Sequence, residues 1–194
     1  MLRLRRPPKP GDDDMLLETP QETTPPGEEP DCRPTEPVLY LLAGKIGAGK
    51  STLAATLARR PKTLLFSEDT LLSELYPGEV TDISNYIRCS LRLKYALKDH
   101  IVSLLKSGFS VVLDFPANTP DGRRWGKELF EAAGVPHELH YLDIPNTICK
   151  SRLRARNAKG EHPFQTSDAD FDKITSYFIP PMPEEGFNII RHVK

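Results

Sequence analysis

The sequence VLYLLAGKIGAGKSTLAATLAR, residues 38–59, joins a short apolar run to a segment rich in alanine and leucine. Residues 38–42 are almost continuously apolar, which is typical of a parallel strand buried on both faces. Residues 51–59 contain good helix formers, with leucines and alanines at helical spacing on one face. The stretch therefore predicts a buried strand, a glycine-containing loop and a helix, in that order.

The predicted loop has the full spacing G-x-x-x-x-G-K-[ST], which is the phosphate-binding P-loop signature. Its glycines let successive N–H groups point at phosphate oxygens, and the following helix N-terminus adds its dipole. We expect Lys50 to neutralise the β- and γ-phosphates of ATP and the Ser51 hydroxyl to ligate Mg²⁺. The expected nucleotide-binding residues are Gly44, Lys45, Ile46, Gly47, Ala48, Gly49, Lys50, Ser51 and Thr52.

The composition changes sharply near Val38. Nine of the 19 prolines precede it, together with two acidic clusters and few aromatic or β-branched residues. Such a segment buries too little apolar surface to order itself. Residues 1–37 are therefore predicted to be a disordered tail or an overlong start, with docking of a partner as the alternative. Residues 38–194 are predicted to form one domain.

Charge and cysteine content exclude several classes of protein. The tail holds 5 of the 26 basic and 9 of the 27 acidic residues, which leaves 21 against 18 and is no nucleic-acid footprint. Cys32, Cys89 and Cys149 lack C-x-x-C spacing and predict reduced thiols rather than disulfides or a zinc site. No signal peptide or membrane span is recognisable, so we expect a cytoplasmic protein without a membrane partner.

Four further segments have the composition of strands, namely 63–67, 109–115, 138–144 and 187–193, and the first of them is predicted to be buried. Helices are expected between them, over about 84–107, 120–133, 146–156 and 168–178. Strands that alternate with helices predict an α/β fold, here a three-layer αβα sandwich around a mainly parallel five-stranded sheet. Ligands of such sheets bind beyond the carboxyl ends of the strands, so polar residues directly after each strand are candidates for chemistry.

Ser67, Glu68 and Asp69 follow the second predicted strand. A carboxylate at this position can accept a proton from an attacking hydroxyl, or act through the water shell of a metal ion. The alternative is structural, because Ser67 or Asp69 can cap the following helix.

Asp114 follows the residues VVL near the end of the third predicted strand, in the apolar-run-plus-aspartate form of a Walker B motif. We expect Asp114 in the Mg²⁺ and substrate cleft, against the alternative of a turn-forming aspartate. Asn118 and Arg123 are candidate substrate contacts at the same rim, and a turn or cap role is the alternative for Asn118.

These motifs together resemble a family, the P-loop kinase group that includes polynucleotide 5′-kinases, zeta toxins, chloramphenicol phosphotransferase and small bacterial AAA-type predicted kinases. The resemblance covers about residues 38–192 and rests on GKIGAGKST, SEDTLL, VVLDFPANT, RLRARN and PPMPEEGFNII. It implies ATP and Mg²⁺ held by Lys50 and Ser51, Asp69 as the general base, and a mobile lid near 157–167. It also implies Arg152 or Arg156 as the lid arginine.

The sequence departs from this family at one position. Polynucleotide kinases place an arginine three residues after the catalytic aspartate, and here that residue is Leu72. The departure favours a small hydroxyl compound over a nucleic-acid end. We therefore expect an ATP- and Mg²⁺-dependent phosphotransferase with an unidentified small-molecule acceptor. The alternatives are a nucleic-acid 5′-hydroxyl or zeta-toxin-like sugar-nucleotide kinase, and an ATP-sensing regulatory NTPase without an acceptor.

Overall fold

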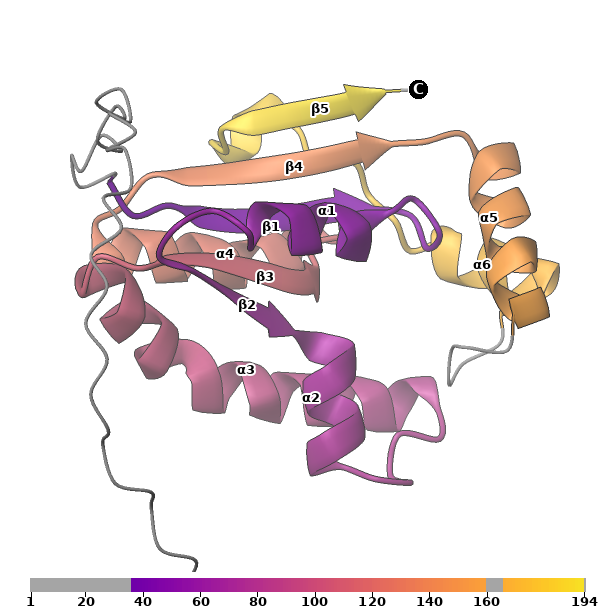
Figure 1. Ribbon diagram of the computed structural model, residues 1–194. Coiled ribbons are helices and arrows are strands. Elements are labelled where there is room, and N and C mark those ends of the chain that lie inside the picture. Colours follow the sequence, from indigo (N-terminus) through magenta and orange to yellow (C-terminus); the bar gives the residue numbers. More distant parts are fainter. Residues whose placement is uncertain (1–35, 160–165, 194) are drawn as a thin grey trace, which may run out of the picture. The chain divides into compact units, whose positions relative to one another are not determined.

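The computed structural model describes residues 36–159 and 166–193. Almost all of the predicted tail, 1–37, and residues 160–165 of the predicted lid lie outside the described residues. Figure 1 shows the elements, which in chain order are β1 (Leu39–Gly44), α1 (Lys50–Leu57), β2 (Thr63–Ser67), α2 (Glu68–Leu75), α3 (Ile83–Lys106), β3 (Ser110–Pro116), α4 (Pro120–Ala133), β4 (His137–Asp143), α5 (Asn146–Lys159), α6 (Asp168–Thr175), the 3₁₀ turn η1 (Pro183–Glu185) and β5 (Ile189–Val193).

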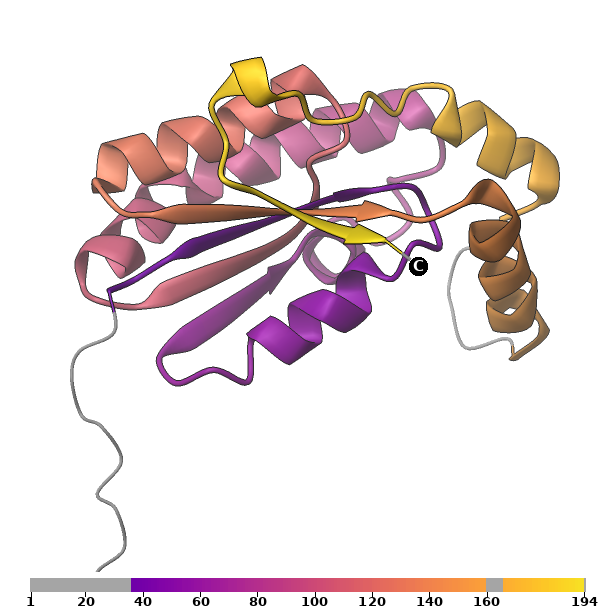
Figure 2. The same ribbon diagram turned by 90° about the horizontal axis from the view of Figure 1, so that it is seen from above.

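The five strands form one sheet in the order β2-β3-β1-β4-β5, and all four neighbouring pairs are parallel. Helix α1 covers one face of the sheet, and α3 and α4 cover the other (Figure 2). The predicted three-layer αβα sandwich with a five-stranded sheet is therefore confirmed. Parallel strands bring all their carboxyl ends to one edge, where α5, α6 and the first half of α3 also lie (Figure 1).

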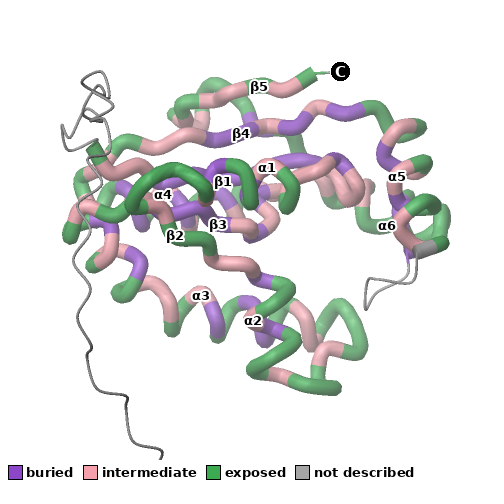
Figure 3. The backbone as a smooth tube through the Cα atoms, in the orientation of Figure 1, coloured by how far each residue is buried: buried purple, intermediate pink, exposed green. Residues whose placement is uncertain are grey.

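Strand β1 is buried along its whole length because it lies in the middle of the sheet (Figure 3). Leu39 and Leu41 belong to the main core, formed with α3 and α4. Tyr40 and Leu42 point to the opposite face and pack with Ala54 of α1. The loop that follows β1 is consequently held at the centre of the carboxyl edge, between flanking strands on both sides.

The prediction that 63–67 is a buried strand is wrong in one respect. The strand forms with the predicted bounds, but it lies at the edge of the sheet and pairs only with β3. Leu64 and Leu65 are 38% and 41% exposed as a result. An apolar run does not distinguish an edge strand from a central one, because strand order depends on distant segments.

Helix α6 ends three residues earlier than predicted, at Thr175 rather than residue 178. The amides of Tyr177 and Phe178 bond to carbonyls only three residues back, which tightens the chain into a turn. The amide of Ile179 then donates to the carbonyl of Asn118, 2.9 Å away. A tertiary contact with the β3–α4 loop thus follows directly on the end of the helix.

Candidate active site at the carboxyl edge of the sheet

The loop after β1 has the backbone of a phosphate-binding loop. Gly44, Gly47 and Gly49 have φ values of 152°, 77° and 106°, which side-chain-bearing residues rarely adopt. A Cβ atom at Gly47 would lie 2.7 Å from the carbonyl oxygen of Cys149, so that position has no room for one. Gly49 begins α1 without a side-chain cap, which leaves the first amides of the helix for an anion.

Lys50 folds back over this loop. Its Nζ atom donates to the carbonyl oxygens of Gly44 and Lys45, at 2.7 and 3.1 Å. Burial lowers the pKa of Lys50, while the negative charges of Asp114 and Asp69 act in the opposite direction. A buried ammonium group on a loop of inward-pointing amides is best stabilised by a further negative charge, such as that of a phosphate.

Ser51 and Asp114 form a second pair beside the loop. The Ser51 hydroxyl lies close enough to the Asp114 carboxylate to act on its pKa. Burial raises the pKa of Asp114, although Ser51 and the charge of Lys50 act to lower it. Hydroxyl and carboxylate oxygens are hard ligands that suit Mg²⁺, which takes one or two protein ligands beside phosphate oxygens and waters. No group of three or more His, Cys, Asp or Glu side chains in the described residues is arranged as a complete metal cage.

The residues after β2 separate into a cap, a buried carboxylate and an exposed one. The Ser67 hydroxyl accepts from the Thr70 amide and caps α2, so the helix does not need Asp69 as its cap. Glu68 is completely buried and accepts short hydrogen bonds, both 2.5 Å, from Tyr86 and Ser90 of α3. Asp69 is exposed on the first turn of the helix.

Strand register explains why these groups meet. Ser67 at the end of β2 pairs with Asp114 on β3, and β3 pairs with β1, which leads into the loop. The charge of Asp69 acts on both Lys50 and Asp114. The structure therefore brings together four of the predicted site residues, Lys50, Ser51, Asp69 and Asp114.

Of the two predicted lid arginines, one contacts the loop. The Arg152 guanidinium donates through Nη1 to the Ala48 carbonyl at 2.7 Å, and it lies beside Gly49. Arg156 is one turn further along α5, and its Nε atom is buried without a hydrogen-bond partner among the described residues. Arg154, on another face of the helix, pairs with Asp168 at 2.5 Å.

Asn118 lies next to the loop but makes a structural bond. Its Oδ1 atom accepts from the amide of Gly44 at 2.9 Å, across 74 positions of sequence. This bond fixes the residue at which β1 turns into the loop. The backbone carbonyl of Asn118 accepts a hydrogen bond from the Ile179 amide, so both its side chain and its backbone are bonded within the protein. Asn118 thus orients the loop, and the predicted substrate contact stays a prediction.

The predicted substrate contact by Arg123 does not fit its surroundings. The side chain is completely buried, and its Nε and Nη2 atoms donate to both carboxylate oxygens of Glu185 at 2.6 and 2.8 Å. Its Nη1 atom donates to the carbonyls of Ala117 and Ile179. With its donors engaged and no exposed surface, Arg123 joins α4 to the segment that leads into β5.

Replacing Glu185 with glutamine is expected to lower the free energy of unfolding by about 3 kcal/mol, because the buried guanidinium of Arg123 loses its counter-charge. Urea unfolding at neutral pH measures this loss. Glu184→Gln, an exposed neighbour, is the matched control and should leave the unfolding midpoint unchanged. Equal midpoints for the two variants would contradict the proposed role of the ion pair.

The stability that Glu185→Gln loses is expected to depend on pH. The hydrogen bonds from Arg123 hold the pKa of Glu185 below its ordinary value of 4.5. A lowered carboxylate pKa gives stability that is complete above the unfolded value and is lost as the pH falls through the folded one. The difference in stability between wild type and Glu185→Gln should therefore shrink below about pH 4.5.

A pocket of about 670 Å³ opens directly beside the loop. Its walls come from Ala48 and Gly49, the outer face of α1, the ends of β4 and β5, and Arg152. Arg191 and His192 of β5 line it as well, and the sequence patterns did not single them out. Nothing in a strand's own sequence shows that it will border a helix from the other end of the domain.

A family model described as an AAA domain matches residues 39–181 of the sequence. The chain belongs to the AAA domain family. This match spans the loop, both strand-end aspartates and α5, so the predicted membership in a P-loop kinase-like group is confirmed at the level of family and fold.

Solved structures with the same fold support this placement. A candidate kinase from Chloroflexus aurantiacus is 22% identical, with 81% of this chain and 85% of that one covered and a TM-score of 0.63. The APS kinase CysC of Mycobacterium tuberculosis, in complex with AMPPNP and APS, is 18% identical over 81% and 88%, with a TM-score of 0.55. Kti12 of Chaetomium thermophilum, in complex with ADP-AlF3, is 14% identical over 81% and 89%, with a TM-score of 0.58.

At these identities the likeness shows the fold of this AAA domain and not its reaction. No curated protein matches the sequence significantly. Within the part of the chain that the structure describes, no helix has the length and apolar character needed to cross a membrane.

Proposed function

We propose that the protein transfers the γ-phosphate of ATP to a hydroxyl group of a small molecule in a Mg²⁺-dependent reaction. The observation that supports this most strongly is the convergence of Lys50, Ser51, Asp69 and Asp114 around one phosphate-binding loop. A loop that only sensed ATP has no need of an exposed carboxylate beside the phosphates. The family and the kinase-like fold agree with this proposal.

The loop and the pocket beside it support a position for the nucleotide. Its phosphates would accept hydrogen bonds from the amides between Gly44 and Ser51, where the glycines and the start of α1 direct N–H groups inward. Its nucleoside would extend into the adjoining 670 Å³ pocket between α1 and β5. Arg152 borders both regions, so its charge can reach the phosphates from the nucleoside side.

Each residue then has a defined task. Lys50 releases its two carbonyl partners and donates to the β- and γ-phosphates. Ser51 and Asp114 would hold Mg²⁺, which when bound supplies positive charge to the phosphate oxygens. Asp69 accepts the proton of the acceptor hydroxyl while that oxygen bonds to the γ-phosphorus and the bond to the departing ADP oxygen breaks.

The acceptor side favours a small molecule over a nucleic-acid end. The helix position at which polynucleotide kinases carry an arginine is Leu72, and its side chain is only 4% exposed. That position therefore offers no charge to a phosphate of a nucleic-acid substrate. The nearly balanced charge of the sequence after residue 37 also lacks the basic excess of a nucleic-acid-binding surface.

A screen for acceptor-dependent ADP release tests the proposal. Purified protein with ATP and Mg²⁺ would be offered sugars, amino alcohols, nucleosides and oligonucleotides with free 5′-hydroxyls. We expect release to be stimulated by a class of small hydroxyl compounds and abolished by removing Mg²⁺. Stimulation only by oligonucleotide ends would overturn the small-molecule assignment. Tight ATP binding without stimulation by any class would favour the regulatory NTPase.

A further inference from the structure

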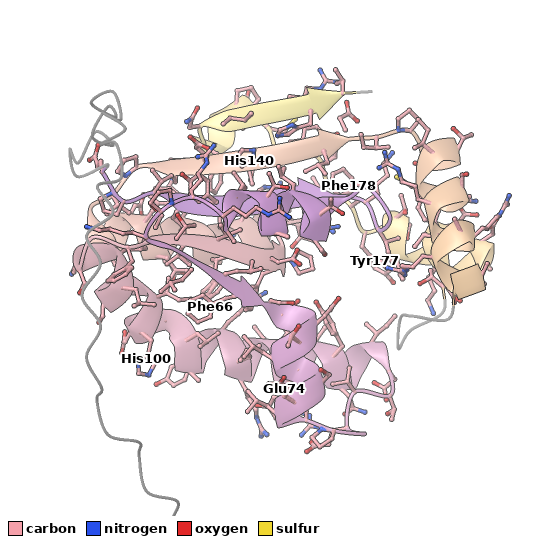
Figure 4. All side chains as sticks on the ribbon, in the orientation of Figure 1. Phe66, Glu74, His100, His140, Tyr177 and Phe178 are labelled. Atoms are coloured by element: carbon pink, nitrogen blue, oxygen red, sulfur yellow. The ribbon has the colours of Figure 1, made fainter. Side chains whose placement is uncertain are left out.

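Three polar side chains form a chain of hydrogen bonds on the α1-facing side of the sheet. Glu138 and His140 are two positions apart on β4 and therefore share one face of the sheet. They pair in register with Tyr40 and Leu42, which belong to the cluster that packs on α1. His192 on β5 pairs in register with Leu142 and so points to the same face. Figure 4 labels His140 on β4.

The distances define the order of the chain. His140 Nε2 lies 3.1 Å from a carboxylate oxygen of Glu138, and His140 Nδ1 lies 2.9 Å from His192 Nε2. His140 is only 4% exposed, and its ring is tilted against that of Tyr40, which in turn accepts a hydrogen bond from Arg60. Glu138, His192 and Tyr40 thus fix the position of the His140 ring.

These contacts determine which ring nitrogens carry protons. The carboxylate of Glu138 only accepts, so His140 Nε2 must donate to it. Burial lowers the pKa of His140, although the Glu138 carboxylate acts in the opposite direction, and in the neutral ring the Nδ1 atom is a bare acceptor. His192 Nε2 must then donate to it, so a His192 ring that carries a single proton has a bare acceptor at Nδ1.

His192 also lines the pocket beside the phosphate-binding loop, at its β5 end. No described residue donates a hydrogen bond to its Nδ1 atom. The chain of hydrogen bonds from Glu138 through His140 thus ends in an acceptor atom of His192, at the proposed nucleoside position.

We propose that Glu138 and His140 fix the tautomer of His192, whose bare Nδ1 atom selects adenine by accepting a hydrogen bond from the 6-amino group. This inference rests on the proposed function, since it needs a nucleotide in the pocket. Hypoxanthine and guanine carry a carbonyl oxygen at the same position, so two acceptors would face each other and neither would be satisfied. His192 would be the contacting residue, and Glu138 and His140 the positioning residues.

Calorimetric titrations with Mg²⁺ and either ADP or IDP test the assignment. IDP differs from ADP at the 6-position and in the proton on the adjoining N1. We expect wild-type protein to bind ADP about tenfold or more tightly than IDP. His192→Phe keeps the ring and removes the acceptor, so it should weaken ADP binding and leave IDP binding nearly unchanged.

Glu138→Gln supplies an independent test, because an amide can donate as well as accept and no longer fixes the tautomer. The ratio of the two affinities should fall towards one, whereas a merely structural effect would weaken both nucleotides together. His100→Phe, on the exposed side of α3 (Figure 4), is the matched control and should keep the wild-type ratio.

The outcomes separate this inference from the proposed function. Equal binding of ADP and IDP by wild-type protein, or an unchanged ratio in folded His192→Phe and Glu138→Gln, would overturn the role of His192 while leaving nucleotide binding intact. Failure of wild-type protein to bind either nucleotide would overturn the proposed function and this inference together.

Discussion

Replacement of Asp69 by asparagine is expected to lower phosphoryl transfer by roughly a hundredfold or more while ATP affinity is retained. Asparagine keeps the shape of the side chain but cannot take the proton of the acceptor hydroxyl. The structure removes the competing explanation, because Ser67 and not Asp69 caps α2. A loss of turnover in this variant would therefore not come from a frayed helix.

The measurement is turnover with the acceptor found in the screen, or slow hydrolysis of ATP before an acceptor is known. Glu74→Gln, which makes the same change of carboxylate to amide at an exposed position of α2, serves as the control. If Asp69→Asn binds ATP and turns over at the wild-type rate, Asp69 is not the base. Asp114 would then be the next candidate, since burial raises its pKa.

Replacement of Lys50 by methionine should weaken ATP binding by roughly 10- to 100-fold, because charge-assisted hydrogen bonds to the phosphates are lost. Burial lowers the pKa of Lys50, so the folded protein holds an ammonium group at a cost that methionine does not carry. The melting temperature of the nucleotide-free variant should accordingly equal or exceed that of the wild type.

Calorimetric titration with ATP and a thermal melt followed by circular dichroism measure both effects. Lys173→Met, at an exposed position of α6, is the control for loss of a positive charge. Unchanged ATP affinity in a folded Lys50→Met variant would contradict the assignment of the phosphate site. A large drop in melting temperature would instead show that Lys50 stabilises the loop through its carbonyl contacts.

Local patterns in the sequence predicted the local structure around the candidate site well. Spacing alone located the loop, and an apolar run that ends in a carboxylate located Asp114. Thr119 caps α4 by accepting from the Gly122 amide, as a threonine directly before a helix favours. These features depend on residues a few positions apart, so a local sequence pattern is enough to predict them.

The parts that were missed depend on distant partners. Asn118 and Arg123 look alike as polar residues after a strand, but one bonds to Gly44 and the other to Glu185. Those partners are 74 and 62 positions away, and no local pattern indicates them.

Glu68 and Asp69 show the same limit at the scale of one helical turn. Both are carboxylates after the same strand, and only the packing of α2 on α3 decides that Glu68 is inside and Asp69 outside. The chain of hydrogen bonds to His192 could not be predicted from the sequence either, because it depends on the register between β4 and β5.

The central place of β1 also has a consequence for how the chain folds. Leu39 pairs with Val111 on one side and with His137 on the other, so both neighbours of β1 are made long after it during synthesis. Pairings between segments this far apart in sequence form slowly. Until β3 and β4 arrive, β1 is an apolar strand with two open edges, the kind of segment on which nascent chains aggregate. The loop thus cannot bind nucleotide when it first leaves the ribosome. Binding must wait until more than half of the domain has been synthesised.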